Sequence, residues 1–147
     1  MDILTDILQE LDIEPKQVQT VPALTLAYLG DCIYELVIRT MLVEKGIAHV
    51  SELNKAAVGF VKASAQKEMY FAVEEELSEE EIAAFKRGRN VRSSGVPKNA
   101  SVNDYRIATG YEAMLGYLYA SGKSGRVVEL VKKGAAARGK NDPEGRG

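Results

Sequence analysis

Apolar residues recur three and four positions apart along almost the whole chain, and no stretch of useful length alternates in the manner of a strand. This pattern predicts an all-α fold. The expected helices cover about residues 2–12, 23–44, 51–75, 78–87, 101–121 and 124–137. The helix over 23–44 is apolar on nearly every side, so we expect it to be a buried central helix.

Capping residues mark several of the expected helix ends. Ser51 and Ser101 can each cap the start of a helix, and Gly46 can end the long apolar helix. Ser78 followed by Glu81 matches the capping-box pattern. We expect the helix that this box opens to be short and exposed.

The chain is predicted to contain one helical domain. Residues 1–22 form an N-terminal helix and a linker bracketed by Pro15 and Pro22, and residues 23–137 form the domain. Residues 138–147 contain no apolar side chain outside Pro143 that could anchor them, so they are expected to be a disordered tail.

Several classes of protein are excluded by what the sequence lacks. With one cysteine, Cys32, and one histidine, His49, the chain has neither an internal disulfide nor a metal site of the Cys/His type. We expect Cys32 to be a small core residue and His49 a loop residue. The acidic N-terminus is unlike a signal peptide, and no apolar run approaches the roughly 18 residues of a membrane span. A cytoplasmic protein with no membrane contact is expected.

Charge is distributed unevenly although the net charge is only −2. Residues 74–81 read EEELSEEE, whereas residues 86–98 read KRGRNVRSSGVPK and contain no acid. Gly, Ser, Asn and Pro make 88–100 a predicted loop. If the chain binds a polyanion, we expect this region to contact it, or else to be a solvated face. The candidate residues are Arg87, Arg89, Arg92 and Lys98.

Two carboxylates, Asp31 and Glu112, lie within apolar helical segments. Burying an unpaired carboxylate is costly, so each is expected to have a partner. Gly30, Gly110 and Gly116 each weaken a helix interior by about 1 kcal/mol relative to Ala, a cost that is explained if two helices approach closely there. Such an approach would bring the two acids together.

The residues alone leave two interpretations of this acid pair. A divalent cation such as Mg²⁺ accepts one or two carboxylates together with several waters, which would relieve the repulsion between the acids. Alternatively, each acid caps a helix or pairs with an arginine such as Arg39 or Arg106.

The motifs around these acids resemble those of a known family. LAYLGDCIYELVIR, which contains Asp31, resembles the signature helix of ribonuclease III catalytic domains, and TGYEAMLGYLY, which contains Glu112, resembles their second signature. RGRNVRSSGVPKN followed by DYRIATGYEA resembles specifically the short Mini-ribonuclease III family, which lacks a double-stranded-RNA-binding domain. The resemblance runs from about Leu24 to Ala120.

This resemblance implies a function. It implies the ribonuclease III helical bundle as a homodimeric, Mg²⁺-dependent endonuclease for double-stranded RNA, with Mn²⁺ as a substitute, that leaves 5′-phosphate and 3′-hydroxyl ends. Asp31 and Glu112 would bind the metal and be catalytic. The basic segment would contact phosphates, and Tyr28 would insert into the partner subunit at the dimer interface. The implied substrate is precursor 23S ribosomal RNA in ribosome biogenesis, with a ribosomal protein as a helper.

Two departures from full-length ribonuclease III leave alternatives open. Ala27 and Thr109 stand where that family has further carboxylates. The metal site is therefore expected to have fewer protein ligands and more bound water. Glu35 either replaces a missing ligand or pairs with Arg39 four residues on. The rival functions are a catalytically silent RNA-binding or ribosome-assembly protein and a helical interaction module that uses the EEELSEEE face.

Overall fold

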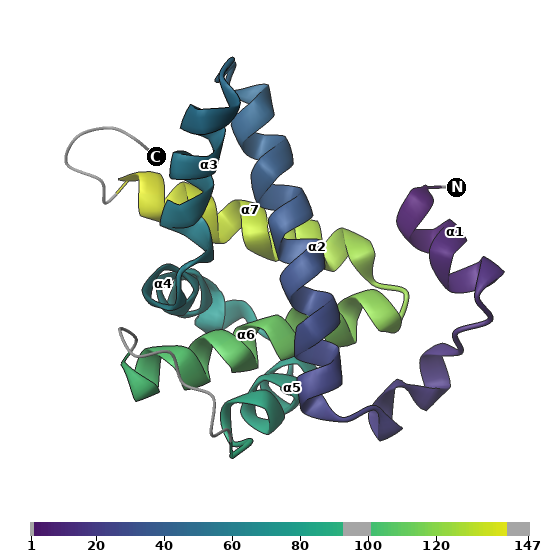
Figure 1. Cartoon of the computed structure of the whole chain (residues 1–147). Coiled ribbons are helices and arrows are strands. Elements are labelled where there is room, and N and C mark those ends of the chain that lie inside the picture. The colour runs from purple at the N-terminus through teal and green to yellow at the C-terminus, as the bar shows by residue number, and fades with distance from the viewer. Residues whose placement is uncertain (1, 93–100, 141–147) are drawn as a thin grey trace.

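The computed structural model describes residues 2–92 and 101–140, and in these residues it contains helices and no strand. Across these described residues, seven α-helices and two short 3-10 helices follow one another (Figure 1). They are α1 (Ile3–Glu10), η1 (Pro15–Thr20), α2 (Ala23–Glu44), α3 (Val50–Val61), α4 (Ala63–Val73), η2 (Glu74–Glu76), α5 (Glu79–Arg89), α6 (Val102–Ala120) and α7 (Ser124–Lys140). The all-α prediction is therefore confirmed.

Helix α6, and not α2, is the central helix of the bundle. From Ile107 to Ala120 every α6 residue except Glu112 is buried, because α2, α4, α5 and α7 all pack around it. Helix α2 crosses α6 and buries only one side (Figure 1). The expectation of a buried helix over 23–44 was wrong for its other side, where Leu24, Tyr28, Leu36 and Val43 are exposed.

Helices α2 and α6 touch through their backbones. A Cβ added to Gly30 would overlap the main-chain carbonyl of Glu112, and one added to Gly116 would overlap that of Leu26. The predicted close approach is thus confirmed for these two glycines. Gly110 instead faces Phe85 of α5, where an added Cβ would come within 2.7 Å of the ring.

The predicted helix over 51–75 is two helices. Lys62 is extended, with φ −66° and ψ 153°, and separates α3 from α4. The last carbonyls of α3 accept hydrogen bonds from side chains outside the helix: Gly59 from Arg138 (3.0 Å), Phe60 from Tyr34 (2.7 Å) and Val61 from Gln66 (3.2 Å). These side chains replace the intrahelical donors that a continuous helix would have supplied, so the chain can turn here without a glycine or a proline.

Three of the four predicted helix caps are present, and one is not. The capping box of Ser78 and Glu81 is present in full, and Ser101 accepts from the backbone of Asp104. Gly46 follows α2 with φ +85°, as expected of a C-terminal glycine. Ser51 caps nothing, because α3 already begins at Val50.

Helix α5 corrects the expectation of an exposed helix. Ala84, Phe85 and Gly88 are buried against α6, and the Phe85 ring stacks on Tyr70 with centroids 3.7 Å apart. The helix continues to Arg89, so it takes up the first residues of the predicted loop over 88–100.

The two ends of the domain differ in how they are held. Helix α1 lies to one side of the bundle in Figure 1, with Leu8 buried but Ile3 and Leu11 exposed. Helix α7 runs to Lys140, past its predicted end at 137, and residues 141–147 lie outside the described residues. Within the described part of the chain, no helix is long and apolar enough to cross a membrane.

We predict that Gly30→Ala lowers the free energy of unfolding by about 1–3 kcal/mol, because the added methyl must push α2 away from α6. Gly59→Ala is the matched control: an added Cβ there meets nothing within 4 Å, so this change should stabilise α3 by about 0.5–1 kcal/mol. Urea unfolding of both variants measures the difference. Equal effects of the two changes would show that the helix contact does not constrain the fold.

Candidate functional site

The candidate site lies where α2 and α6 cross. Asp31 follows Gly30 on α2, and Glu112 is the α6 residue whose carbonyl abuts Gly30. The two carboxyl groups interact directly, through a hydrogen bond and through charge repulsion. The glycine contact therefore brings together the two acids that the sequence singled out. Asp31 itself is exposed, which corrects the expectation that both acids are buried, whereas Glu112 is partly buried.

The surroundings of Glu112 favour its neutral form. Burial is the largest cause, the contact with Asp31 adds to it, and Glu35 adds further negative charge, while the amide of Gln66 acts in the opposite direction. Together they raise the pKa of Glu112 from 4.5 to about 8. Two acids held this close, without a cation between them, therefore retain a proton near neutral pH.

No arginine neutralises this pair among the described residues. Arg39 binds Glu35 at 3.2 Å, which confirms the pairing at four residues' spacing, and that bond is exposed. Arg106 is exposed, and none of the ion pairs among the described residues involves Asp31 or Glu112. The interpretation in which Arg39 or Arg106 satisfies the acids is thus not supported.

The residues present fit a divalent cation held mainly by water. The described residues include no group of three or more His, Cys, Asp and Glu side chains that could hold a metal. The two positions that lack a carboxylate are occupied otherwise: Ala27 is buried, and the Thr109 hydroxyl donates to the backbone carbonyl of Tyr105 at 2.9 Å. Two adjoining carboxylates suit Mg²⁺, which keeps several waters and uses few protein ligands.

Gln66 is a site neighbour that the sequence interpretation missed. It is 2% exposed, and its amide contacts Glu112. Its position could have indicated a role: on α4 it lies between the buried residues Ala65 and Met69, and glutamine is usually exposed.

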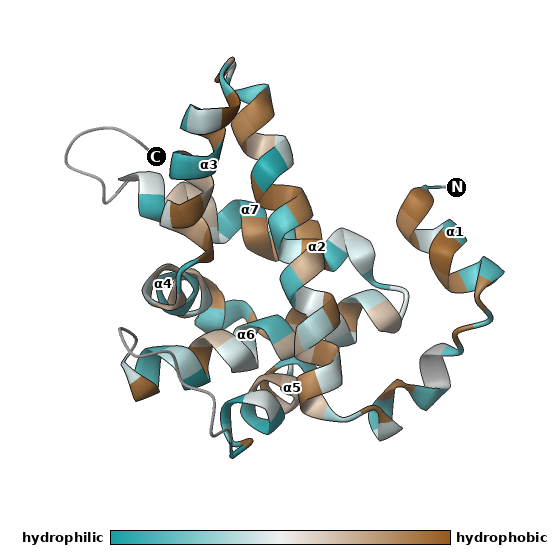
Figure 2. Ribbon diagram, in the orientation of Figure 1, coloured by the Kyte–Doolittle hydropathy of each residue, from teal (hydrophilic) through white to brown (hydrophobic). Residues whose placement is uncertain are grey.

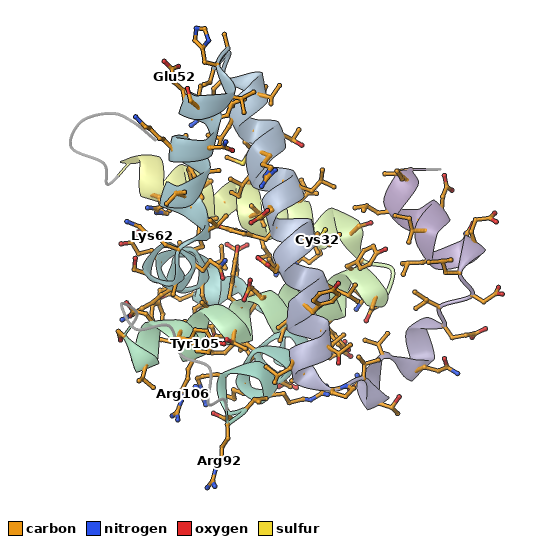
Figure 3. All side chains as sticks on the ribbon, viewed as in Figure 1. Cys32, Glu52, Lys62, Arg92, Tyr105 and Arg106 are labelled. Carbon is orange, nitrogen blue, oxygen red and sulfur yellow. The ribbon has the colours of Figure 1, made fainter. Side chains whose placement is uncertain are left out.

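The four basic candidates are not equivalent. Arg87 donates to the carbonyl of Val21 at 2.9 Å, which ties α5 to the segment before α2. Arg89 bonds Asn90 at 3.1 Å, and its guanidinium lies 5.6 Å from the centre of the Phe85 ring. Arg92 is exposed and projects from the bundle beyond α5 (Figure 3). Lys98 lies outside the described residues.

The outer side of α2 carries an apolar stripe. Tyr28 is 79% exposed. On the same side, Leu24 is exposed one turn before it and Leu36 two turns after it. Cys32 is also exposed between Tyr28 and Leu36, so its expected core position was wrong. Hydrophobic segments recur along α2 in Figure 2. We refer to Leu24, Tyr28, Cys32 and Leu36 as the α2 stripe.

Part of the acidic segment over 74–81 is used inside the fold. Glu81 binds Arg126 of α7 at 2.8 Å, and Glu76 binds Lys133 at the same distance. These bonds hold α7 against η2 and α5. They leave fewer carboxylates for a partner than the sequence suggested, which weakens the case for an acidic interaction face.

The raised pKa of Glu112 generates a prediction for the metal-free protein. The folded chain holds this proton to a higher pH than the unfolded chain, so the free energy of unfolding should fall as the pH rises from 4.5 to about 8. The fall is up to about 1.4 kcal/mol for each pH unit. Urea unfolding in EDTA at several pH values measures it, and Glu112→Gln should flatten the dependence. A wild-type profile as flat as that of the variant would refute the stated environment of Glu112.

Comparison with known proteins places the chain in one family. The ribonuclease III domain matches residues 24–123. The Mini-ribonuclease 3 of Clostridium tetani is 46% identical over 110 residues, which cover 74% of this chain and 73% of that protein. The Mini-ribonuclease 3 of Symbiobacterium thermophilum is 40% identical over 116 residues, covering 79% of this chain and 89% of that protein. A crystal structure of a Fusobacterium nucleatum protein superposes with a TM-score of 0.73 at 29% identity, covering 84% of this chain and 98% of that one. The chain is therefore an endoribonuclease of the ribonuclease III family, and within that family it belongs with the Mini-ribonucleases 3.

Proposed function

We propose that this chain is a Mg²⁺-dependent endonuclease for double-stranded RNA in which Asp31 and Glu112 are the catalytic, metal-binding residues. The observation that carries the proposal is the direct contact between these two acids, without an arginine partner among the described residues. When bound, Mg²⁺ supplies Lewis-acid stabilisation of the charge that develops on the phosphate and activates the attacking water. Mn²⁺ has similar ligand preferences and can replace it.

The chain's own residues hold and orient the acids. Gly30 and Gly116 let the two backbones touch, which fixes the distance between the helix that carries Asp31 and the helix that carries Glu112. With a cation bound between the acids, Glu112 would lose its proton, because the cation would offset the charge of Asp31 in the proton's place. Hydrolysis by a metal-activated water would need no nucleophilic side chain, so His49 and Cys32 need no catalytic role.

The basic residues near the C-terminal end of α5 are proposed to contact phosphates on either side of the cut. Arg92 is the freest of the described candidates, Arg89 is held over Phe85, and Arg87 is used in part by Val21. Duplex RNA is recognised mainly through its backbone and 2′-hydroxyl groups, which such cations can contact without aromatic stacking.

The proposed biological substrate is the precursor of 23S ribosomal RNA, processed in the cytoplasm during ribosome biogenesis with a ribosomal protein as a helper. The family resemblance supports this assignment. Mapping the ends of 23S ribosomal RNA in cells with and without the protein tests it, since unprocessed ends should accumulate only in the deletion strain.

We predict that Asp31→Asn and Glu112→Gln each reduce cleavage of duplex RNA in Mg²⁺ by at least about a hundredfold, because each change removes a charge and preserves shape. Both variants should still fold and bind the duplex. Gel analysis of cleavage and a filter-binding assay measure the two properties separately. Near-normal cleavage by either variant would exclude the acid pair as the catalytic site.

The same binding assay also tests the basic residues. Arg89→Ala combined with Arg92→Ala should weaken duplex binding and reduce the salt dependence, since fewer counterions are released for each lost phosphate contact. The acid variants are the control, because their salt dependence should equal that of the wild type. An unchanged salt slope in the arginine variant would count against these two contacts.

A homodimer is proposed because a duplex offers two strands and one acid pair can cut one of them. The α2 stripe supports this assembly, since a row of exposed apolar side chains on an ordered helix is stabilised when it is covered. Tyr28 lies three residues before Asp31, so a partner seated on the stripe would adjoin the acid pair.

Tyr28→Lys should therefore shift the protein toward monomer, because the interface would have to bury an unpaired charge. It should also depress cleavage of both strands although the acids are unchanged. Val128→Lys is the matched control: Val128 is a similarly apolar, 44% exposed residue on α7, outside the stripe. Light scattering reports the assembly, and a wild-type protein that is monomeric at micromolar concentration would refute the dimer.

A further inference from the structure

Gln66 occupies a position in the core that packing alone does not explain. Its side chain is 2% exposed on α4, among apolar neighbours such as Met69 and Tyr70 that are also buried. Burying an amide costs free energy unless each polar atom finds a partner. The partners of Gln66 therefore indicate what the residue does.

One side of the amide is satisfied at the junction between α3 and α4. Its Nε2 donates to the carbonyl of Val61 at 3.2 Å, next to the Tyr34 and Arg138 bonds that end α3. This contact accounts for one hydrogen bond. A purely structural role at the junction would need nothing more.

The same amide also reaches the acid pair. It contacts the carboxyl group of Glu112 and favours its charged form, against burial and against the charge of Asp31. Its Oε1 has no hydrogen-bond partner among the described residues. A buried amide oxygen without a donor is expensive, and oxygen atoms of this type are ligands that hard cations accept.

We propose that Gln66 is a positioning residue of the cation site, which holds the Glu112 carboxylate beside Asp31 and makes cation affinity depend on the junction between α3 and α4. Gln66 is a fixed neighbour of Glu112, since its amide nitrogen also donates to the carbonyl of Val61. A Glu112 carboxylate that is already fixed loses little conformational entropy when the cation binds, so the binding is tighter. This inference rests on the proposed role of Asp31 and Glu112.

The test compares Gln66→Met with Arg138→Met. Both substitutions remove one donor to a carbonyl at the end of α3, Val61 in the first case and Gly59 in the second, but only Gln66 contacts Glu112. Loss of a residue that orients a ligand typically weakens metal affinity 10–100-fold. We expect Gln66→Met to raise the Kd for Mg²⁺ and Mn²⁺ by about tenfold or more, whereas Arg138→Met should leave both near the wild-type values.

Three measurements separate positioning from stability. Calorimetric titration gives the Kd for Mn²⁺, the Mg²⁺-induced rise in Tm reports binding to the folded chain, and Tm in EDTA reports stability alone. Both variants should lower Tm in EDTA, and only Gln66→Met should lose most of the Mg²⁺-induced rise. Gln66→Asn, which keeps an amide but is too short to span from Val61 to Glu112, provides a second variant that should weaken Mn²⁺ binding in the same direction.

The outcomes distinguish this inference from the proposed function. If Asp31→Asn abolishes Mn²⁺ binding while Gln66→Met and Gln66→Asn bind it as the wild type does, the positioning role is refuted and the acid pair stands. Equal weakening by Gln66→Met and Arg138→Met also refutes it, because the junction alone would then account for the effect. If Asp31→Asn binds Mn²⁺ normally, the acid pair itself is not the cation site.

Discussion

The contact between the backbones of α2 and α6 is the constraint on which the rest of this protein depends. A helix pair meeting at Gly30 and Gly116 has no side chain between the two main chains, so the residues beside the contact are held at a nearly fixed separation. Asp31 and Glu112 are such residues. Burial, together with the charge of Asp31, gives Glu112 its raised pKa, and this unfavourable state is maintained by the packing of α2, α4, α5 and α7 against α6.

The described residues around the two acids supply neither a cationic partner nor a third metal-binding carboxylate. The nearby arginine, Arg39, is already engaged by Glu35, and the positions that carry further carboxylates in full-length ribonuclease III hold Ala27 and Thr109. A neutralising arginine would have made the acid pair a stable structural bridge with no need of a cation. No arginine among the described residues does so, which leaves repulsion that the proposed divalent ion would relieve, and the free energy of ion binding would include that relief.

The sequence predicted the parts of this arrangement that have a local signal. Gly30 and Gly116 are unfavourable inside helices, so their presence there indicated close packing, and the acids beside them indicated a site. The capping box at Ser78 is likewise local. By contrast, the break at Lys62 depends on Tyr34 and Arg138, which lie outside 51–75, as well as on Gln66 within it, so the pattern of that segment alone does not contain the information.

Exposure was harder to predict for the same reason. A helix that is apolar all round has no preferred inner side, so periodicity could not tell that Asp31 and Cys32 are exposed on α2 while Ile33 and Tyr34 are buried. The choice is made by the glycine contact, which rotates α2 into place. Helix α5 shows the converse: it looked polar because its acids and bases dominate, yet Ala84, Phe85 and Gly88 are buried where it packs against the core.

The junction between α3 and α4 also bears on how fast the protein folds. Helical proteins usually fold quickly because most of their contacts join residues close in sequence. Here the end of α3 is completed by Arg138, which is 79 residues from Gly59, and the segment before α2 is joined to α6 by a hydrogen bond from Gln19 to Tyr117 across 98 residues. Closing loops of that length costs entropy before the bonds are gained. The contact between Gly30 and Glu112 spans a similar separation, so this protein is expected to fold more slowly than a helical bundle held together by local contacts.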